Sequence, residues 1–239
     1  MTGFVWNGSV WERQKQLSLW NGSAWEEVGS AWHWYNGAWE RLYVKPLLFS
    51  DNFNRSNQYL DASANWVQYT NGTSTYRSYI SSNVVSVFHN TTDSTTPSWA
   101  RWVNPTASDH QFVQATVTST NTTHNSWLTL GMSSDLQTWI GVQIGGDASG
   151  IYSTTNGGST ITQRASATNS TSASQVWRLE RLGNVYTAFR SGTQIAQFDN
   201  SGGTVAGTGR YVGLGTTRRR AAFVNSQSPN LDDWSAGDL

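Results

Sequence analysis

Apolar and polar residues alternate along much of the chain after residue 110. In "FVQATVT" (112–118) and "TWIGVQI" (138–144), every second residue is apolar. Successive side chains of a β-strand point to opposite faces of the sheet, so this period of two predicts strands buried on one face. Ile140, Val142 and Ile144 share the buried face of the second run, and Trp139 faces the other way.

Turn residues separate these short runs. Gly183-Asn184 and Ser191-Gly192 divide residues 176–198 into three strands of a predicted meander. No window has a convincing helical period. Many short strands with no helices between them predict an antiparallel sandwich or jelly roll. The other runs of this kind are "WLTLGM" (127–132) and "YVGLGT" (211–216).

A different pattern fills the first forty residues, where "VWNGSVWE", "LWNGSAWE" and "WYNGAWE" follow one another. Gly8-Ser9 and Gly22-Ser23 suit type II′ turns, and Asn36-Gly37 suits a type I′ turn. Each copy then forms a β-hairpin that places its two tryptophans opposite each other, on a rung without backbone hydrogen bonds. The pairs are Trp6 with Trp11, Trp20 with Trp25, and Trp34 with Trp39.

Three interpretations of these six tryptophans stay open. They are structural clasps of the hairpins, part of their surface is a docking face for attachment or oligomerisation, or their rings stack on sugars. Small hairpins are marginal alone in water, so we expect them to stack on each other, on the next domain or on another copy of the chain. Pro46 can end the last hairpin strand, which predicts hairpin repeats in residues 1–45 and a second domain in residues 46–239.

Composition narrows the function. The 239-residue chain has a formal net charge of zero and only 13% charged residues, which argues against nonspecific nucleic-acid binding. It has no cysteine, and no stretch resembles a signal peptide or a membrane anchor. Neither a cofactor nor membrane insertion is expected.

Three segments carry a family resemblance. "FSDNFNRSNQYLDASANW" (49–66), "WRLERLGNVYTAFRSGTQIAQF" (177–198) and "NLDDWSAGDL" (230–239) resemble the concanavalin A-like jelly roll of laminin G-type modules, legume-type lectins and many glucanases. The "WNGSxW" repeats before such a domain resemble minor tail and other virion proteins of tailed bacteriophages. The second resemblance implies N-terminal repeats that attach to other virion proteins, a projecting jelly roll, a homotrimer, and a virion assembled in the host cytoplasm.

The resemblance to glucanases implies a catalytic cluster of two glutamates and an aspartate alternating along one strand. After Glu40 the chain has a single glutamate, Glu180, and no strand segment offers two acids at alternating positions. Retaining glycosidases need two carboxyl groups about 5–5.5 Å apart. The four histidines are scattered and no Gly-x-Ser-x-Gly motif occurs. No catalytic residues are therefore assigned.

Two kinds of binding site remain open. Jelly rolls resembling this one sometimes bind a structural calcium where the first and last strands meet. The resemblance implies that Asp51, Asp232 and Asp233 would be its ligands here. Exposed aromatic rings on a concave face would stack on the sugars of a host-surface glycan, although packing in the core is the alternative. The candidates for this role are Trp139, Trp127, Trp99, Trp102 and Tyr152.

The sequence thus predicts a non-enzymatic all-β protein, with hairpin repeats followed by a concanavalin A-like jelly-roll sandwich. Its expected role is that of a structural virion protein, in the tail or on the capsid surface, with weak glycan binding. The alternatives are a carbohydrate-binding module or lectin-like adhesin outside a virion, and then a glycoside hydrolase.

Overall fold

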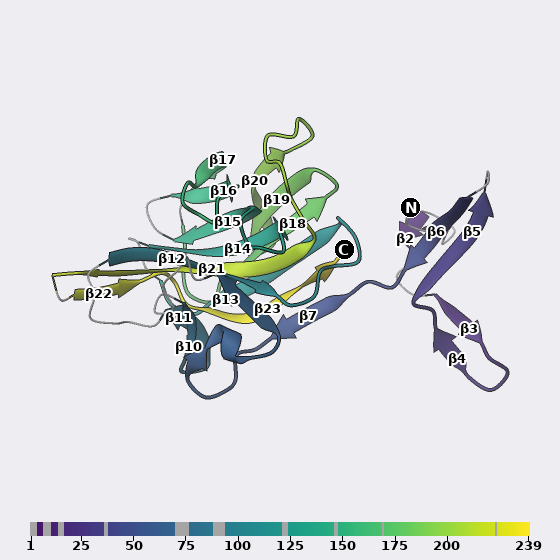
Figure 1. Ribbon diagram of the computed structural model, residues 1–239, viewed down its shortest axis with the longest axis horizontal. Coiled ribbons are helices and arrows are strands. Elements are labelled where there is room, and N and C mark those ends of the chain that lie inside the picture. The colour runs from purple at the N-terminus through teal and green to yellow at the C-terminus, as the bar shows by residue number, and fades with distance from the viewer. Residues whose placement is uncertain are drawn as a thin grey trace. The chain divides into compact units, whose positions relative to one another are not determined.

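The chain forms two compact units, Met1–Leu47 and Leu48–Leu239 (Figure 1). In the computed structural model the described residues are 4–6, 11–13, 17–35, 38–69, 77–87, 94–120, 124–145, 148–168, 170–222 and 224–239. No helix in these segments is both long and apolar enough to cross a membrane.

The first unit consists of antiparallel hairpins. Phe4–Trp6 (β1) pairs with Trp11–Arg13 (β2), Ser18–Trp20 (β3) with Trp25–Glu27 (β4), and Ser30–Tyr35 (β5) with Ala38–Val44 (β6). In each hairpin the two tryptophans of the repeat are directly opposite one another. The predicted register is therefore confirmed.

The turn of the middle hairpin explains its own asparagine and glutamate. Gly22 has a φ of +100°, which glycine adopts readily, as predicted. The side-chain oxygen of Asn21 accepts hydrogen bonds from the backbone N–H groups of Ser23 and Ala24, at 2.9 Å each, and its amide donates to Glu26. The Trp20 and Trp25 rings pack with centroids 5.7 Å apart. The predicted turns at Gly8-Ser9 and Asn36-Gly37 lie outside the described residues.

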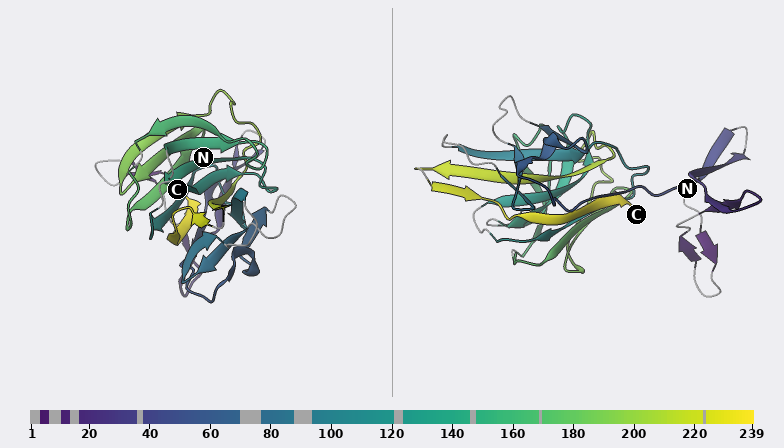
Figure 2. Two further views of the ribbon diagram at one scale, coloured as in Figure 1. Left: turned by 90° about the vertical axis from the view of Figure 1, so that its left-hand side faces the viewer. Right: turned by 90° about the horizontal axis from the view of Figure 1, so that it is seen from below.

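The second unit is a sandwich of two antiparallel sheets, and its strands run in two layers in Figure 2. The only helical element described within it is a single 3₁₀ turn, Leu60–Ala62. The all-β jelly-roll prediction is confirmed. The predicted meander of residues 176–198 is present as β18, β19 and β20.

The first sheet has the order β20 (Thr193–Asp199), β19 (Val185–Arg190), β18 (Val176–Leu182), β13 (Gln111–Val117), β23 (Leu231–Asp238), β11 (Val84–Val87), β10 (Ser78–Ser81) and β8 (Gln58–Tyr59), with β7 (Leu48–Asp51) also paired to β23. The second sheet has the order β17 (Thr162–Ala167), β16 (Ser149–Thr154), β15 (Trp139–Gly145), β14 (Asn125–Met132), β21 (Tyr211–Ala221), β12 (Ser94–Trp102) and β9 (Trp66–Tyr69), with β22 (Val224–Gln227) paired to β21.

The main core combines residues of both sheets. Val113, Ala115 and Val117 of β13 are buried there, as the alternation in that strand predicts. Ile140, Val142 and Ile144 of β15 belong to the same core and are fully buried.

A second, smaller core contains Trp139 with Trp99, Trp127, Met132 and Leu136. Trp139 therefore faces away from Ile140, as predicted. Trp99 is opposite Gly215 on β21, where a Cβ would lie 2.3 Å from its ring. A Cβ on Gly158 would lie 2.4 Å from Trp99 Nε1, so that loop glycine packs against the same indole. Glycines at these positions leave room for the ring on the sheet.

Candidate functional site

A gap beside the last strand of the first sheet creates the candidate site. Strand β7 ends at Asp51, opposite Trp234 of β23. Strand β11 pairs with β23 through Val85 and Leu231. Between these two pairings, the described residues place no strand partner on that side of Asp232 and Asp233.

The same segment of β23 contains a β-bulge. Its register against β13 shifts between Gln114, which is opposite Ser235, and Thr116, which is opposite Asp232. Asp233 has a φ of +48°. This left-handed conformation is unusual outside glycine, although aspartate and asparagine adopt it more often than most residues. Bulges change the direction of side chains and are frequent next to functional sites.

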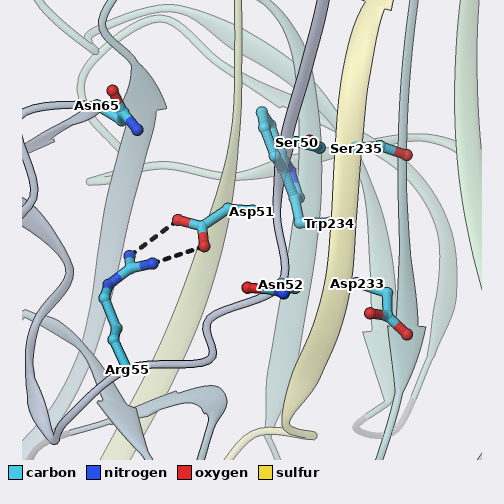
Figure 3. A pocket seen from close by; sticks show the side chains of 8 residues that line it. All are labelled: Ser50, Asp51, Asn52, Arg55, Asn65, Asp233, Trp234 and Ser235. Atoms are coloured by element: carbon cyan, nitrogen blue, oxygen red, sulfur yellow. Dashed lines mark hydrogen bonds and ion pairs between the residues drawn. The ribbon is translucent and has the colours of Figure 1, made fainter.

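The gap opens into a pocket of about 420 Å³. This volume lies within the range of small-molecule sites, roughly 300–1,000 Å³. Its walls come from β7 and the loop that follows, from Asn65 just before β9, and from β23 (Figure 3). The lining residues are Ser50, Asp51, Asn52, Arg55, Asn65, Asp233, Trp234 and Ser235.

A partly buried ion pair holds one wall of the pocket in place. Arg55 Nη1 and Nη2 donate to the two oxygens of Asp51 at 2.6 and 2.8 Å (Figure 3). Trp66 Nε1 and the Phe53 backbone N–H also donate to Asp51, at 2.8 and 2.9 Å. Burial by itself would raise the pKa of Asp51, but these hydrogen bonds and the charge of Arg55 outweigh it and hold the pKa below 3.8. Asp51 is therefore a carboxylate whose oxygens are already in use.

Other groups of the pocket have no side-chain partner among the residues that the structure describes. The side chains of Ser50, Asn65, Asp233 and Ser235 make no hydrogen bond or ion pair with any residue that the structure describes. Asp233 is exposed, and its carboxylate lies apart from the ion pair of the opposite wall (Figure 3). These four side chains are free to bind a polar ligand.

The three aspartates predicted to bind calcium do not form a metal site. No group of three or more His, Cys, Asp or Glu side chains suited to a metal is found among the described residues. The oxygens of Asp51 are used by Arg55, Trp66 and Phe53, and Asp232 accepts a hydrogen bond from the backbone N–H of Asp233. These three aspartates therefore do not form a metal site by themselves among the described residues, and calcium binding stays a prediction.

The aromatic residues predicted to face a glycan are placed in the two cores. Trp99, Trp127 and Trp139 are 1%, 3% and 0% exposed in the smaller core, and Trp102 belongs to the main core. Tyr152 is partly exposed at the edge of the smaller core. The four indoles are therefore packing residues in this structure, as the alternative interpretation expects, and they do not form a surface that a ligand can reach.

Sequence reasoning singled out Asp51 and Asp233 but missed Asn52, Arg55 and Asn65. The spacing of Asp51 and Arg55 in "SDNFNR" was a usable signal, since an acid and a base four residues apart can pair across a tight loop. Asn65 gave no such signal, because it is separated from Asp51 by fourteen positions and reaches the pocket only through the fold.

Comparison with known proteins adds a family. Residues 24–239 match the family model described as "Domain of unknown function (DUF7257)". The chain belongs to this family. No curated protein matches the chain.

Solved structures share the fold of this DUF7257 member. A protein of unknown function with a galectin-like fold from Bacillus subtilis has a TM-score of 0.52 and 9% identity, over 79% of this chain and 94% of that one. The Ca²⁺-bound exoplasmic/lumenal domain of VIP36 has a TM-score of 0.50 and 9% identity, over 80% and 90%. Carbohydrate-binding module CBM66 from Bacillus subtilis has a TM-score of 0.47 and 13% identity, over 73% and 92%. The first two likenesses show a galectin-like jelly roll.

Proposed function

We propose that the second unit, Leu48–Leu239, is a non-enzymatic sugar-binding module that takes its ligand in the pocket beside β23. The observation that carries the proposal is a pocket of suitable volume whose free groups are two hydroxyls, an amide and a carboxylate. Such groups donate to and accept from the hydroxyls of a sugar. The lectin-type fold is consistent with this proposal.

The carboxylates of the pocket argue against hydrolysis. A glycosidase needs one carboxylic acid that keeps its proton and a second carboxylate across the scissile bond. The pKa of Asp51 is lowered and both of its oxygens are bound by Arg55, so it cannot serve as the acid. Glu180, the single glutamate after Glu40, is paired with Arg178 at 2.7 Å. The proposal is therefore binding without catalysis.

Calcium has no part in the proposal. The solved VIP36 domain is a Ca²⁺-bound form, but the three aspartates predicted to bind calcium in this chain form no group suited to a metal among the described residues. We expect sugar binding to be unchanged by a chelator of divalent cations.

A glycan array followed by titration calorimetry tests the proposal. We expect Asn65→Ala to weaken the binding of a positive glycan about fivefold, because one hydrogen bond to the ligand contributes about 1 kcal/mol. Asn54→Ala is the matched control, since this exposed asparagine of the loop after β7 does not line the pocket. Tyr152→Ala tests the rival site at the smaller core. Equal binding by Asn65→Ala and wild type, or a loss of binding confined to Tyr152→Ala, would show that the ligand does not bind in the pocket.

A second function is favoured by the exposed indoles of the first unit. Trp20, Trp25 and Trp34 are 54%, 71% and 59% exposed. Exposed aromatic surface of this kind is typical of interfaces. We propose that the hairpins attach the sugar-binding module to a larger assembly. A tailed-bacteriophage virion, in which the protein is a homotrimer, is the assembly that the sequence resemblance implies.

Two measurements test attachment. If the hairpins also bind one another, sedimentation equilibrium of the full chain should show an oligomer. The double variant Trp20→Ser, Trp25→Ser should weaken that oligomer. Immunogold imaging of particles should locate the chain on a virion, and the same double variant should be missing from it. A wild-type protein that is monomeric and is not found on any particle would contradict both oligomerisation and attachment. Leu47→Ser, at a residue 37% exposed in the same unit, serves as the control.

A further inference from the structure

The charges of the pocket wall do not cancel. Asp51 and Arg55 neutralise each other through two hydrogen bonds, so this pair presents little net charge to a ligand. Asp233 is the remaining charged residue of the lining, and it has no ion pair among the described residues. The pocket therefore carries an excess of one negative charge.

Negative charge also acts on the neighbouring Asp232. Its pKa is raised mainly by burial, and the negative charges of Asp233 and Asp51 add to the rise, although the backbone N–H of Asp233 opposes it. A cation placed near Asp233 would be stabilised by the same charges.

The backbone holds the Asp233 carboxylate outside the regular alternation of β23. In an unbroken strand, Asp232 and Asp233 would project to opposite faces. The bulge and the φ of +48° at Asp233 interrupt this alternation, while Asp233 remains exposed and lines the pocket. A left-handed conformation is unusual at a residue other than glycine, and here it occurs at a residue that lines the pocket.

We infer that the sugar bound in this pocket carries a protonated amine, which pairs with Asp233. This inference rests on the proposed sugar-binding function and names the class of sugar. An ammonium group replaces a hydroxyl with little change of size and supplies three donors to a carboxylate. The free side chains of Ser50, Asn65 and Ser235 then serve the remaining hydroxyls. Acidic sugars are disfavoured by the same charge.

Pairs of methyl glycosides test the inference directly. Methyl glucoside, galactoside and mannoside are each compared with the 2-amino-2-deoxy counterpart, by amide chemical-shift titration of the full chain at about pH 6, where the amine is protonated. We expect the amino sugar to bind about threefold more tightly in the pair that fits. Exposed ion pairs contribute about 0.2–1 kcal/mol, which corresponds to a ratio of about 1.4 to 5. The ratio should fall as salt screens the pair.

Asp233→Asn is the decisive variant, because asparagine keeps the left-handed conformation and removes the charge. It should bring the affinity ratio of amino sugar to neutral sugar close to one, because the charge that favours the ammonium group is gone. Asp109→Asn makes the same charge change at an exposed residue outside the pocket lining and should preserve the ratio.

The outcomes separate the two proposals. Equal affinity within every pair that binds would overturn the amino-sugar inference and leave sugar binding intact. If Asp233→Asn still prefers the amino sugar, then Asp233 is not the residue that pairs with the amine. If no glycoside shifts the amide signals of the pocket, the sugar-binding function itself is refuted.

Discussion

Replacing Asp51 with asparagine tests whether the ion pair that forms one wall of the pocket also stabilises the second unit. The carboxylate accepts four hydrogen bonds, two from Arg55 and one each from Trp66 and Phe53. Asparagine retains one oxygen and places an amide NH₂ where the other oxygen accepted two hydrogen bonds, one from Arg55 and one from either Trp66 or Phe53. At least two hydrogen bonds to a charged group are lost.

The structure sets the size of the effect. Hydrogen bonds to charged groups contribute about 1.5–3 kcal/mol each, and breaking a buried pair costs about 3–5 kcal/mol. The Asp51 side chain is 6% exposed, but that of Arg55 is 26% exposed and can recover part of its hydration. We therefore expect the free energy of unfolding to fall by about 3 kcal/mol at neutral pH.

Urea unfolding of the full chain, followed by the fluorescence of the buried tryptophans, measures this change. Asp233→Asn is the matched control, because that aspartate lines the same pocket without an ion pair, and its effect should stay within about 0.5 kcal/mol. The pKa of Asp51 is lowered, so its contribution is present above the unfolded pKa and is lost as the pH falls below 3.8. Wild type and Asp51→Asn should therefore converge in acid. A difference under about 1 kcal/mol at pH 7, or one that grows in acid, would refute the reasoning.

Two further perturbations probe the packing of the second unit. Gly158→Ala should destabilise it by more than about 2 kcal/mol in the same urea assay, because the new Cβ meets Trp99 at 2.4 Å at a φ of +87°. Gly183→Ala, at a φ of +61° with open space around it, should cost only about 1 kcal/mol. Burial raises the pKa of Tyr186 to about 12, so the stability of the wild type should fall by about 2 kcal/mol between pH 10 and 12 as the unfolded phenol ionises. Tyr186→Phe should remove that part of the pH dependence, and an unchanged slope would contradict it.

Local patterns were enough to predict much of the fold. The period of two in β13 and β15 predicted which side chains enter the main core, and it separated Trp139 from Ile140. Turn chemistry predicted the hairpin register, because a two-residue turn determines which residues face each other. These features depend on neighbours a few positions apart.

The pocket could not be predicted in the same way. It exists because β7 and β11 share one side of β23 and leave a gap opposite Asp232 and Asp233. Alternation assigns a face to every residue of an unbroken strand, so it cannot anticipate the bulge that changes the conformation of Asp233. Alternation also could not predict that the face with Trp139 is buried, since residues from several other strands and loops, such as Trp99 and Leu136, complete the smaller core.

The central position of β23 in the first sheet has a consequence for biosynthesis. This strand joins β13 on one side to β7 and β11 on the other, yet it is made from residues 231–238. While the ribosome is still synthesising the unit, β7 and β13 cannot pair with β23, because β23 has not yet been made. The sheet can close only after translation has passed residue 238, so the nascent chain must keep its unpaired strand edges from associating with other chains until then.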